Sequence, residues 1–145
     1  RAAYKAADQS GLIVSGNAVK GMVSNLEADL ASKGFDANLH PKTTTALKRL
    51  QDVTDDGTGN PQNVTLQGME VLRKVAGQAT QGIDRADKFM ARVVQDHIDN
   101  LMENLGPNDV IGQPDPAALN SLSDARQAWQ RASKGEAIDN LIAKA

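Results

Sequence analysis

The chain has no cysteine, and this absence removes three classes of chemistry. Without a thiol there is no disulfide framework, no thiolate metal site and no cysteine nucleophile. Aromatic residues are scarce as well, at 3% of 145 residues. A hydrophobic core must therefore be built from Leu, Val, Ile, Met and Ala, and the abundant alanine favours closely packed helices.

Charge of one sign is not concentrated anywhere in the sequence. The formal net charge is −2, acidic and basic residues are interspersed, and no stripe of Lys or Arg appears. Binding to a nucleic-acid backbone needs clustered cations, so this class of partner is disfavoured. No run approaches the ~20 apolar residues that cross a bilayer, and no signal-peptide pattern opens the chain. We therefore expect no membrane span in these residues.

The sequence does contain a series of amphipathic helical patterns, in which apolar residues recur every three or four positions. Polar N-cap residues mark the helix starts, and glycines mark several ends. The predicted helices span 1–11, 15–33, 41–53, 65–81, 84–105 and 115–145. The N-cap candidates are Ser15 or Asn17, Thr65, Asp84 and Asp115. After Gly34, Phe35 should fold back onto the preceding turn of its helix.

The segments between these helices show no sustained alternation typical of a strand. The apolar run 12–14 is too short to assign by periodicity, and we interpret it as a connector tucked into the core. The stretches 54–63 and 106–114 are predicted loops on their content of Gly, Pro, Asp and Asn.

Six helices with short connections predict an all-α bundle. The first and last helices are rich in alanine, so we expect them to pack antiparallel as a stem, with the four middle helices as a small head. Residues 1–145 then form a single helical domain. Because both ends lie inside helical patterns, we expect the chain to be a fragment of a longer polypeptide.

The last predicted helix divides near Gly135, where its apolar face shifts by about two residues and a kink is expected. The face from Ile138 to Ala145 would pack on other parts of the parent chain or on another subunit. The only tryptophan, Trp129, lies before the kink. Tryptophan is enriched at binding hot spots, but here we expect it to fill the core of an alanine-rich bundle.

The loop Asp52–Asn63 partly matches the calcium-binding loop of an EF-hand. Asp52, Thr54 and Asp56 occupy positions 1, 3 and 5, and Gly57 occupies position 6. Asn63 stands where the pattern requires a bidentate Glu. Because that ligand is missing, a polar turn is the favoured interpretation, and we expect no bound metal or other cofactor.

His40 and His97 are the only histidines, and neither has a second His or a Cys at ligand spacing. His40 precedes Pro41 at a helix start, so a capping or surface role is expected. His97 lies on the apolar face of its helix, beside Asp96 and Asp99. We expect a partly buried structural residue, because acid–base catalysis needs a partner and a cleft that the sequence does not show.

The remaining polar candidates have ordinary structural explanations. Carboxylates are spread through helices and caps at Glu70, Asp84, Asp87 and Glu103. Serines lie outside any nucleophile-elbow motif at Ser10, Ser15 and Ser24. The triplet Asn63-Val64-Thr65 matches the N-glycosylation pattern, but Thr65 is better explained as a helix cap. The sequence therefore assigns no catalytic, cofactor-binding or metal-binding residue.

Four segments carry a family resemblance and together cover nearly all of the chain. They are AAYKAADQSG, GFDANLHPKTTTALKRL, NVTLQGMEVLRKVAGQA and ALNSLSDARQAWQRASKGEAIDNLIAKA. Their motifs are an AYxAAD-like helix, a VTLxxLxxLR-like helix with Met69 at the second apolar position, and an ARxxWxRxxK-like final helix. The chain thereby resembles a helical domain of large virion-associated proteins of tailed bacteriophages and prophages, some of them internal or ejection-type proteins.

The resemblance implies a non-enzymatic structural or interaction domain, since no catalytic residue belongs to the pattern. Its location would be the virion, or the host cytoplasm when the gene lies in a prophage. Its partners would be other virion proteins or copies of itself, met through the first and last helices, with no small-molecule substrate. The alternative is an accessory domain of a phage-encoded cell-wall lytic or other enzyme whose catalytic part lies elsewhere. A nucleic-acid-binding domain is a third possibility, disfavoured by the balanced charge.

Overall fold

Helices dominate the computed structural model, which describes residues 13–55, 57–111 and 122–133. The body consists of α2 (Gly16–Ser32), α3 (Pro41–Val53), α4 (Leu66–Ala79) and α5 (Arg85–Glu103). A further helix covers residues 122–133. The strands are β1 (Ile13–Val14), β2 (Val64–Thr65) and β3 (Val110–Ile111), with the 3-10 turn η1 (Pro107–Asp109) before β3.

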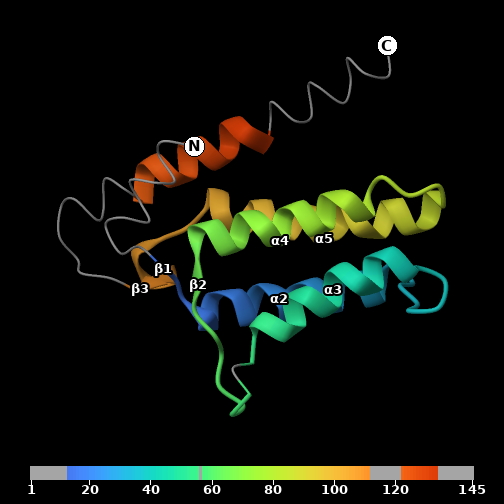
Figure 1. Cartoon of the computed structure of the whole chain (residues 1–145), viewed down its shortest axis with the longest axis horizontal. Coiled ribbons are helices and arrows are strands. Elements are labelled where there is room, and N and C mark those ends of the chain that lie inside the picture. Colours follow the sequence, from blue (N-terminus) through green and yellow to red (C-terminus); the bar gives the residue numbers. More distant parts are fainter. Residues whose placement is uncertain (1–12, 56, 112–121, 134–145) are drawn as a thin grey trace.

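The body helices lie in two layers, with α2 and α3 in one and α4 and α5 in the other (Figure 1). The helix of residues 122–133 lies on the second layer, at the end that carries the strands (Figure 1). Helix α5 is the central element, because it packs against α2, α3 and α4 and is bonded to the helix of 122–133 through Trp129.

A three-stranded antiparallel sheet closes one end of the bundle, in the order β2-β1-β3. Ile13 is paired with both Thr65 and Ile111, and Val14 with Val64 and Val110. The sequence predicted no strand, so the interpretation of 12–14 as a plain connector is wrong for Ile13 and Val14. The expectation that the run enters the core is confirmed for Val14, which is fully buried. The sheet gathers the chain segments before α2, before α4 and after α5.

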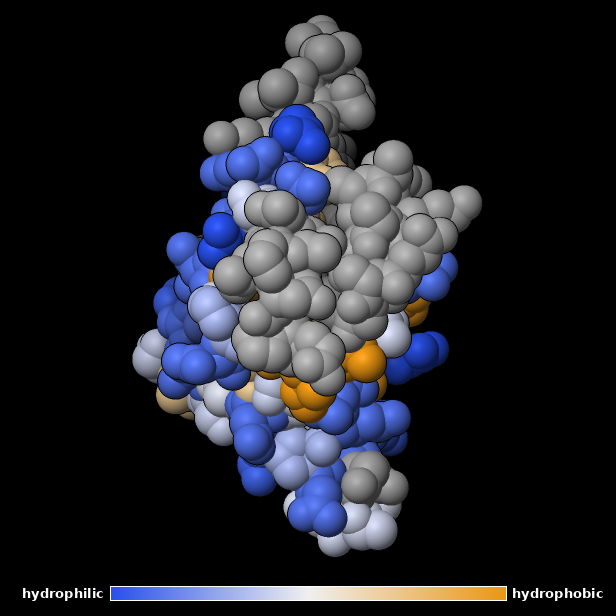
Figure 2. Space-filling view, turned by 90° about the vertical axis from the view of Figure 1, so that its left-hand side faces the viewer, coloured by the Kyte–Doolittle hydropathy of each residue, from blue (hydrophilic) through white to orange (hydrophobic). Residues whose placement is uncertain are grey.

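Figure 2 looks onto this sheet end, where a hydrophobic patch interrupts a largely hydrophilic described surface. Ile111 of β3 is among the exposed large hydrophobic residues of the described chain. The same end brings a loop very close to α2. A Cβ added to Gly16 would lie 2.8 Å from the backbone oxygen of Gln62, so this position has room only for glycine.

Local signals set most helix boundaries as predicted. The side chains of Ser15, Thr65 and Asp84 accept hydrogen bonds from the first turns of α2, α4 and α5. At the end of α2, Gly34 adopts a positive φ of 83°, and the N–H of Phe35 donates to the oxygen of Leu30 at 3.0 Å. This is the predicted fold-back of Phe35 onto the last turn.

The described core is mainly aliphatic, as the composition requires, with Trp129 as a buried aromatic member and Phe35 packed against it. Trp129 is 2% exposed, which confirms its expected core position. The other large, fully buried side chains come from every layer and are Leu26, Leu30, Leu50, Leu66, Met69, Ile98, Met102, Leu105, Val14, Val19 and Val94. The mostly helical character is therefore confirmed, with the small sheet as the difference.

Several expectations fall on residues outside the described ranges. These are the helix over 1–11, the Asp115 cap, the kink near Gly135, the face from Ile138 to Ala145 and the antiparallel stem. They stay predictions.

Candidate interaction groove

A groove of about 700 Å³ runs between α5 and the C-terminal part of α2. Its α2 side is formed by Asp29 and Lys33. The α5 side is formed by Phe89, Val93, Asp96, His97, Asp99, Asn100 and Glu103. Most of these α5 positions recur every three or four residues, so they form one face along roughly 20 Å of helix.

The packing of α5 explains why this face is open. Its buried face centres on Val94, Ile98 and Met102, each fully buried. The apolar spacing of the sequence predicts a stripe on this helix, widened by Phe89, Val93 and Ile98, whose members are Met90, Val94, His97, Leu101 and Leu105. Phe89 is instead 53% exposed, so its predicted place in the core is wrong. The core face is rotated away from this side of the helix.

His97 joins α5 to α2 through the groove. Its Nε2 lies 2.8 Å from Oδ2 of Asp29, and the His97 side chain is 23% exposed. Lys33 donates to the other carboxylate oxygen of Asp29. The hydrogen bonds from Lys33 and then His97 hold the pKa of Asp29 below its usual value. The expected partly buried His97 is confirmed, and the structure adds the partner and the cleft that the sequence could not show.

Asp99 connects three helices at the edge of the groove. Its Oδ1 accepts a hydrogen bond from Arg73 Nε of α4 and one from Trp129 Nε1, both at 2.7 Å. The Asp99 side chain is 17% exposed. Because Asp99 belongs to α5, a single carboxylate holds α4 and the helix of residues 122–133 against it.

Asp96 differs from these bonded carboxylates. It forms no hydrogen bond or ion pair within the described parts of the chain. Partial burial, followed by the negative charge of Asp99, raises the pKa of Asp96 above its usual value. Asp96 is therefore a carboxylate that a cation from outside would stabilise.

The charges along α5 are divided between its two halves. Apart from the capping Asp84 and the buried Asp87, the N-terminal half carries Arg85, Lys88 and Arg92, and the acids that follow them are Asp96, Asp99 and Glu103. Asp99 and Glu103 lie near the C-terminal end of the helix, where the dipole favours cations. Lys88 and Arg92 are also like charges at i,i+4, as are Asp99 and Glu103. The division weakens the helix locally, which is typical of a surface that serves something other than stability.

The groove is closed near Glu103 by the last described helix. Ser133 donates a hydrogen bond of 3.1 Å to Glu103 Oε1, and Arg126 donates one of 2.7 Å to the backbone oxygen of Leu105. Four carboxylates thus line the groove against Lys33 and His97, both bonded to Asp29. The groove is acidic, with an apolar end at Phe89 and Val93.

His40 lies away from this groove and has a different role. It is 5% exposed, so the expected surface position is wrong. Its side chain makes no capping bond to α3. Instead Nδ1 accepts a 3.0 Å hydrogen bond from the N–H of Asp36, and the ring stacks on Phe35 at 5.6 Å between centroids. His40 therefore fixes the α2–α3 turn.

Asp87 supplies the cap that His40 does not. One carboxylate oxygen accepts from the N–H of Lys42 at 2.9 Å, and the other from the N–H of Thr43 at 3.0 Å. The Thr43 hydroxyl adds a bond of 2.6 Å. Burial alone would raise the pKa of Asp87, but these hydrogen bonds outweigh it and hold the pKa below its usual value. The predicted capping role of Asp87 is confirmed, but the helix that it caps is α3 and not its own helix, α5.

The loop between α3 and β2 is a glycine-containing polar turn in its described residues. Asp52 belongs to α3, and Asp55 Oδ1 accepts the N–H groups of Gly57 at 2.8 Å and Gly59 at 3.0 Å. Asp56 lies outside the described ranges. Within 13–55, 57–111 and 122–133, no three His, Cys, Asp or Glu residues are placed to hold a metal ion.

The other candidates take part in local structure where they are described. Ser15 caps α2, Ser24 is exposed on that helix, and Ser10 lies outside the described residues. Asn63 of the glycosylation triplet accepts a 2.9 Å hydrogen bond from Gly16 N, and Thr65 caps α4. The structure brings none of these residues to the groove.

Comparison with known proteins adds no relative from which to transfer a role. The chain matches no family model, no curated protein and no solved structure. Among the described helices, none combines the length and apolarity needed to cross a membrane. The groove is therefore the feature of the molecule that bears on function.

Proposed function

We propose that this chain is a non-enzymatic interaction domain of a phage virion protein of the internal or ejection type. The observation that carries the proposal is the acidic face of α5, which keeps an unfavourable charge order beside an open groove. The phage-like segments of the sequence supply the setting. In this setting, the groove is the surface that binds another virion protein.

The chemistry of the groove favours binding over catalysis. His97 and Asp29 form a histidine–carboxylate pair, which is one part of a general-base arrangement. The lining residues include no hydroxyl or thiol for such a base to activate. The one amine, that of Lys33, is bonded to Asp29. The pair therefore serves to hold α2 against α5.

The groove indicates the chemistry of the partner. Asp96 and Glu103 offer carboxylate oxygens to Lys or Arg side chains, and Phe89 offers an exposed ring to an apolar residue or a cation. An amphipathic helix with one basic edge matches a groove about 20 Å long that follows a helix face. A segment of another virion protein with this pattern is the expected occupant.

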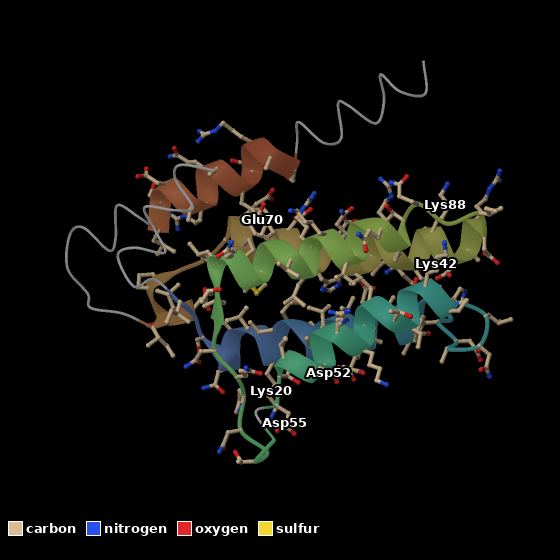
Figure 3. The ribbon with its side chains drawn as sticks, viewed as in Figure 1. Lys20, Lys42, Asp52, Asp55, Glu70 and Lys88 are labelled. Atoms are coloured by element: carbon tan, nitrogen blue, oxygen red, sulfur yellow. The ribbon has the colours of Figure 1, made fainter. Side chains whose placement is uncertain are left out.

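Zero-length coupling of carboxylates to amines in purified particles tests the proposal. We expect mass spectrometry to find the α5 carboxylates joined to lysines of a second virion protein. Asp52 and Asp55, which lie together on another side of the molecule (Figure 3), are the internal control and should not join the same lysines. Absence of the parent chain from the particles would overturn the proposal. A catalytic motif elsewhere in the parent chain, with no such links, would favour the accessory domain of a phage-encoded enzyme.

A further inference from the structure

The end of the bundle opposite the sheet is built from two neighbouring turns (Figure 1). One turn joins α2 to α3 and the other joins α4 to α5. Asp87 of α5 binds the backbone of Lys42 and Thr43, so the turns are held together. The side chain of Lys42 also crosses Gly82, where an added Cβ would lie 3.0 Å from its Cδ. The two turns therefore form one surface, which we name the turn end.

Large apolar side chains are exposed on the turn end. Leu39 is 66% exposed in the first turn and Ile83 is 101% exposed in the second. Phe89, 53% exposed, follows two turns of helix after Ile83. Five large hydrophobic residues of the described chain are exposed, and these three belong to this part of it. Hydrogen bonds fix the backbone of both turns, so the side chains of Leu39 and Ile83 stay exposed to solvent.

The charges that surround these apolar residues are positive. Lys42 and Lys88 lie at the turn end (Figure 3), and Arg85 and Arg92 lie on the same half of α5. Of the acids here, Asp87 is buried, whereas Asp36 and Asp84 are exposed and also accept hydrogen bonds from the backbone. Asp36 accepts from the N–H groups of Asn38 and Leu39, Asp84 from that of Asp87, and Asp87 from those of α3. Four cations therefore outnumber the two exposed acids on this part of the surface.

We propose that the turn end docks onto an anionic lipid surface. Aliphatic side chains at ordered turn tips can enter the interface between headgroups and acyl chains, while Lys and Arg bind the phosphates around them. Nucleic acid would also attract the cations, but its single-stranded bases stack on aromatic rings, and its duplex offers no apolar site for Ile83 and Leu39. The combination of exposed aliphatic tips and outward cations selects the lipid surface. This docking depends on Leu39, Ile83 and the cations around them, whereas the carboxylates of the groove on α5 lie on its C-terminal half. Phe89 borders both surfaces.

Vesicle flotation with the whole chain tests the docking. We expect binding to phosphatidylcholine vesicles that contain phosphatidylglycerol, weaker binding as salt rises, and little binding to pure phosphatidylcholine. Ile83→Ser combined with Leu39→Ser should lower the apparent affinity about tenfold. Lys42→Glu combined with Lys88→Glu should lower it by about tenfold or more.

Two matched variants keep the test specific. Val71→Ser removes an aliphatic residue of α4 that is 51% exposed. Lys20→Glu reverses a cation of α2 that lies away from the turn end (Figure 3). Both variants should bind vesicles as the unsubstituted chain does. Circular dichroism should show that all the variants are folded. Equal losses in these controls, no binding to anionic vesicles at low salt, or binding to duplex DNA without binding to vesicles would overturn the proposal.

Discussion

Asp87 and Asp99 lie about three turns apart on α5 and use the same carboxylate in different ways. Asp87 binds backbone N–H groups of α3 in the buried body of the bundle. Asp99 binds the side chains of Arg73 and Trp129 near the surface. The Asp87 carboxylate caps α3, and the Asp99 carboxylate attaches the helix of residues 122–133 to α5.

The difference predicts unequal costs of removal. The first N–H groups of a helix need an acceptor from outside the helix, and the N-cap residue His40 offers none through its side chain. Loss of Asp87 therefore leaves buried donors unsatisfied. The side chains of Arg73 and Asp99 are 15% and 17% exposed, so loss of Asp99 lets water reach part of the polar surface that remains.

The largest effect is expected for Asp87→Ala, which should lower the free energy of unfolding by about 3 kcal/mol, because several buried hydrogen bonds are lost together. Urea denaturation followed by circular dichroism measures it. Asp87→Asn keeps the shape and one acceptor oxygen, so its loss should be about half as large. A loss below about 0.5 kcal/mol for Asp87→Ala would show that α3 finds another cap.

Asp99→Ala should cost about 2 kcal/mol and shift the emission of the single tryptophan, because the indole N–H of Trp129 loses its partner. Trp129→Phe is the matched variant. It removes the N–H donor together with part of the buried ring volume and should cost at least about 1 kcal/mol. If Asp99→Ala proved more costly than Asp87→Ala in the same titration, the contrast between the two carboxylates would be reversed.

The dependence of stability on pH in the acid range should distinguish Asp87 from ordinary surface carboxylates. Its pKa is lower in the folded chain than its usual value of 3.8. The stability that Asp87 contributes is therefore complete above pH 3.8 and is lost as the pH falls through the lowered value. Asp87→Asn should flatten this part of the curve of unfolding free energy against pH. An unchanged acid slope would contradict the assigned hydrogen bonds.

The contribution of Asp96 to the free energy of unfolding should have the opposite pH dependence, and this effect should be the smallest of those predicted. Its pKa lies above 3.8 in the folded chain, so its contribution is most favourable below pH 3.8 and is lost as the pH rises through the raised value. Asp96→Asn should therefore stabilise the chain at neutral pH, by less than about 1 kcal/mol because solvent screens an exposed group. The gain should vanish in thermal unfolding at acidic pH. Destabilisation at neutral pH would mean that Asp96 has a favourable partner.

Short-range signals were sufficient for the helix boundaries. Ser15, Thr65 and Asp84 each bond within three residues of their own position, and Gly34 with Phe35 needs only the preceding turn. Each strand has two residues, and its identity depends on partners about 50 or 100 positions away. Periodicity carries no trace of such pairing. The sequence therefore predicted the helices and missed the sheet.

The groove could be predicted only in part. Its charges on α5 are visible in the sequence, and His97 was correctly expected to be partly buried. The partner of His97 is Asp29, 68 positions earlier, and only packing brings the two together. The exposure of Phe89 was missed because its spacing fits both the core face and the groove face of α5. A small rotation of an amphipathic helix decides between these faces.

The incorporation of Asp96→Lys into phage particles tests the central claim, that the acidic half of α5 meets another protein. Asp52→Lys makes the same change on the exposed side of α3 and serves as the control. We predict that Asp96→Lys folds about as stably as the unsubstituted chain, because the lost repulsion from Asp99 offsets the lost attraction to Arg92. It should nevertheless be incorporated about tenfold less than Asp52→Lys. Equal incorporation of the two variants would contradict the claim.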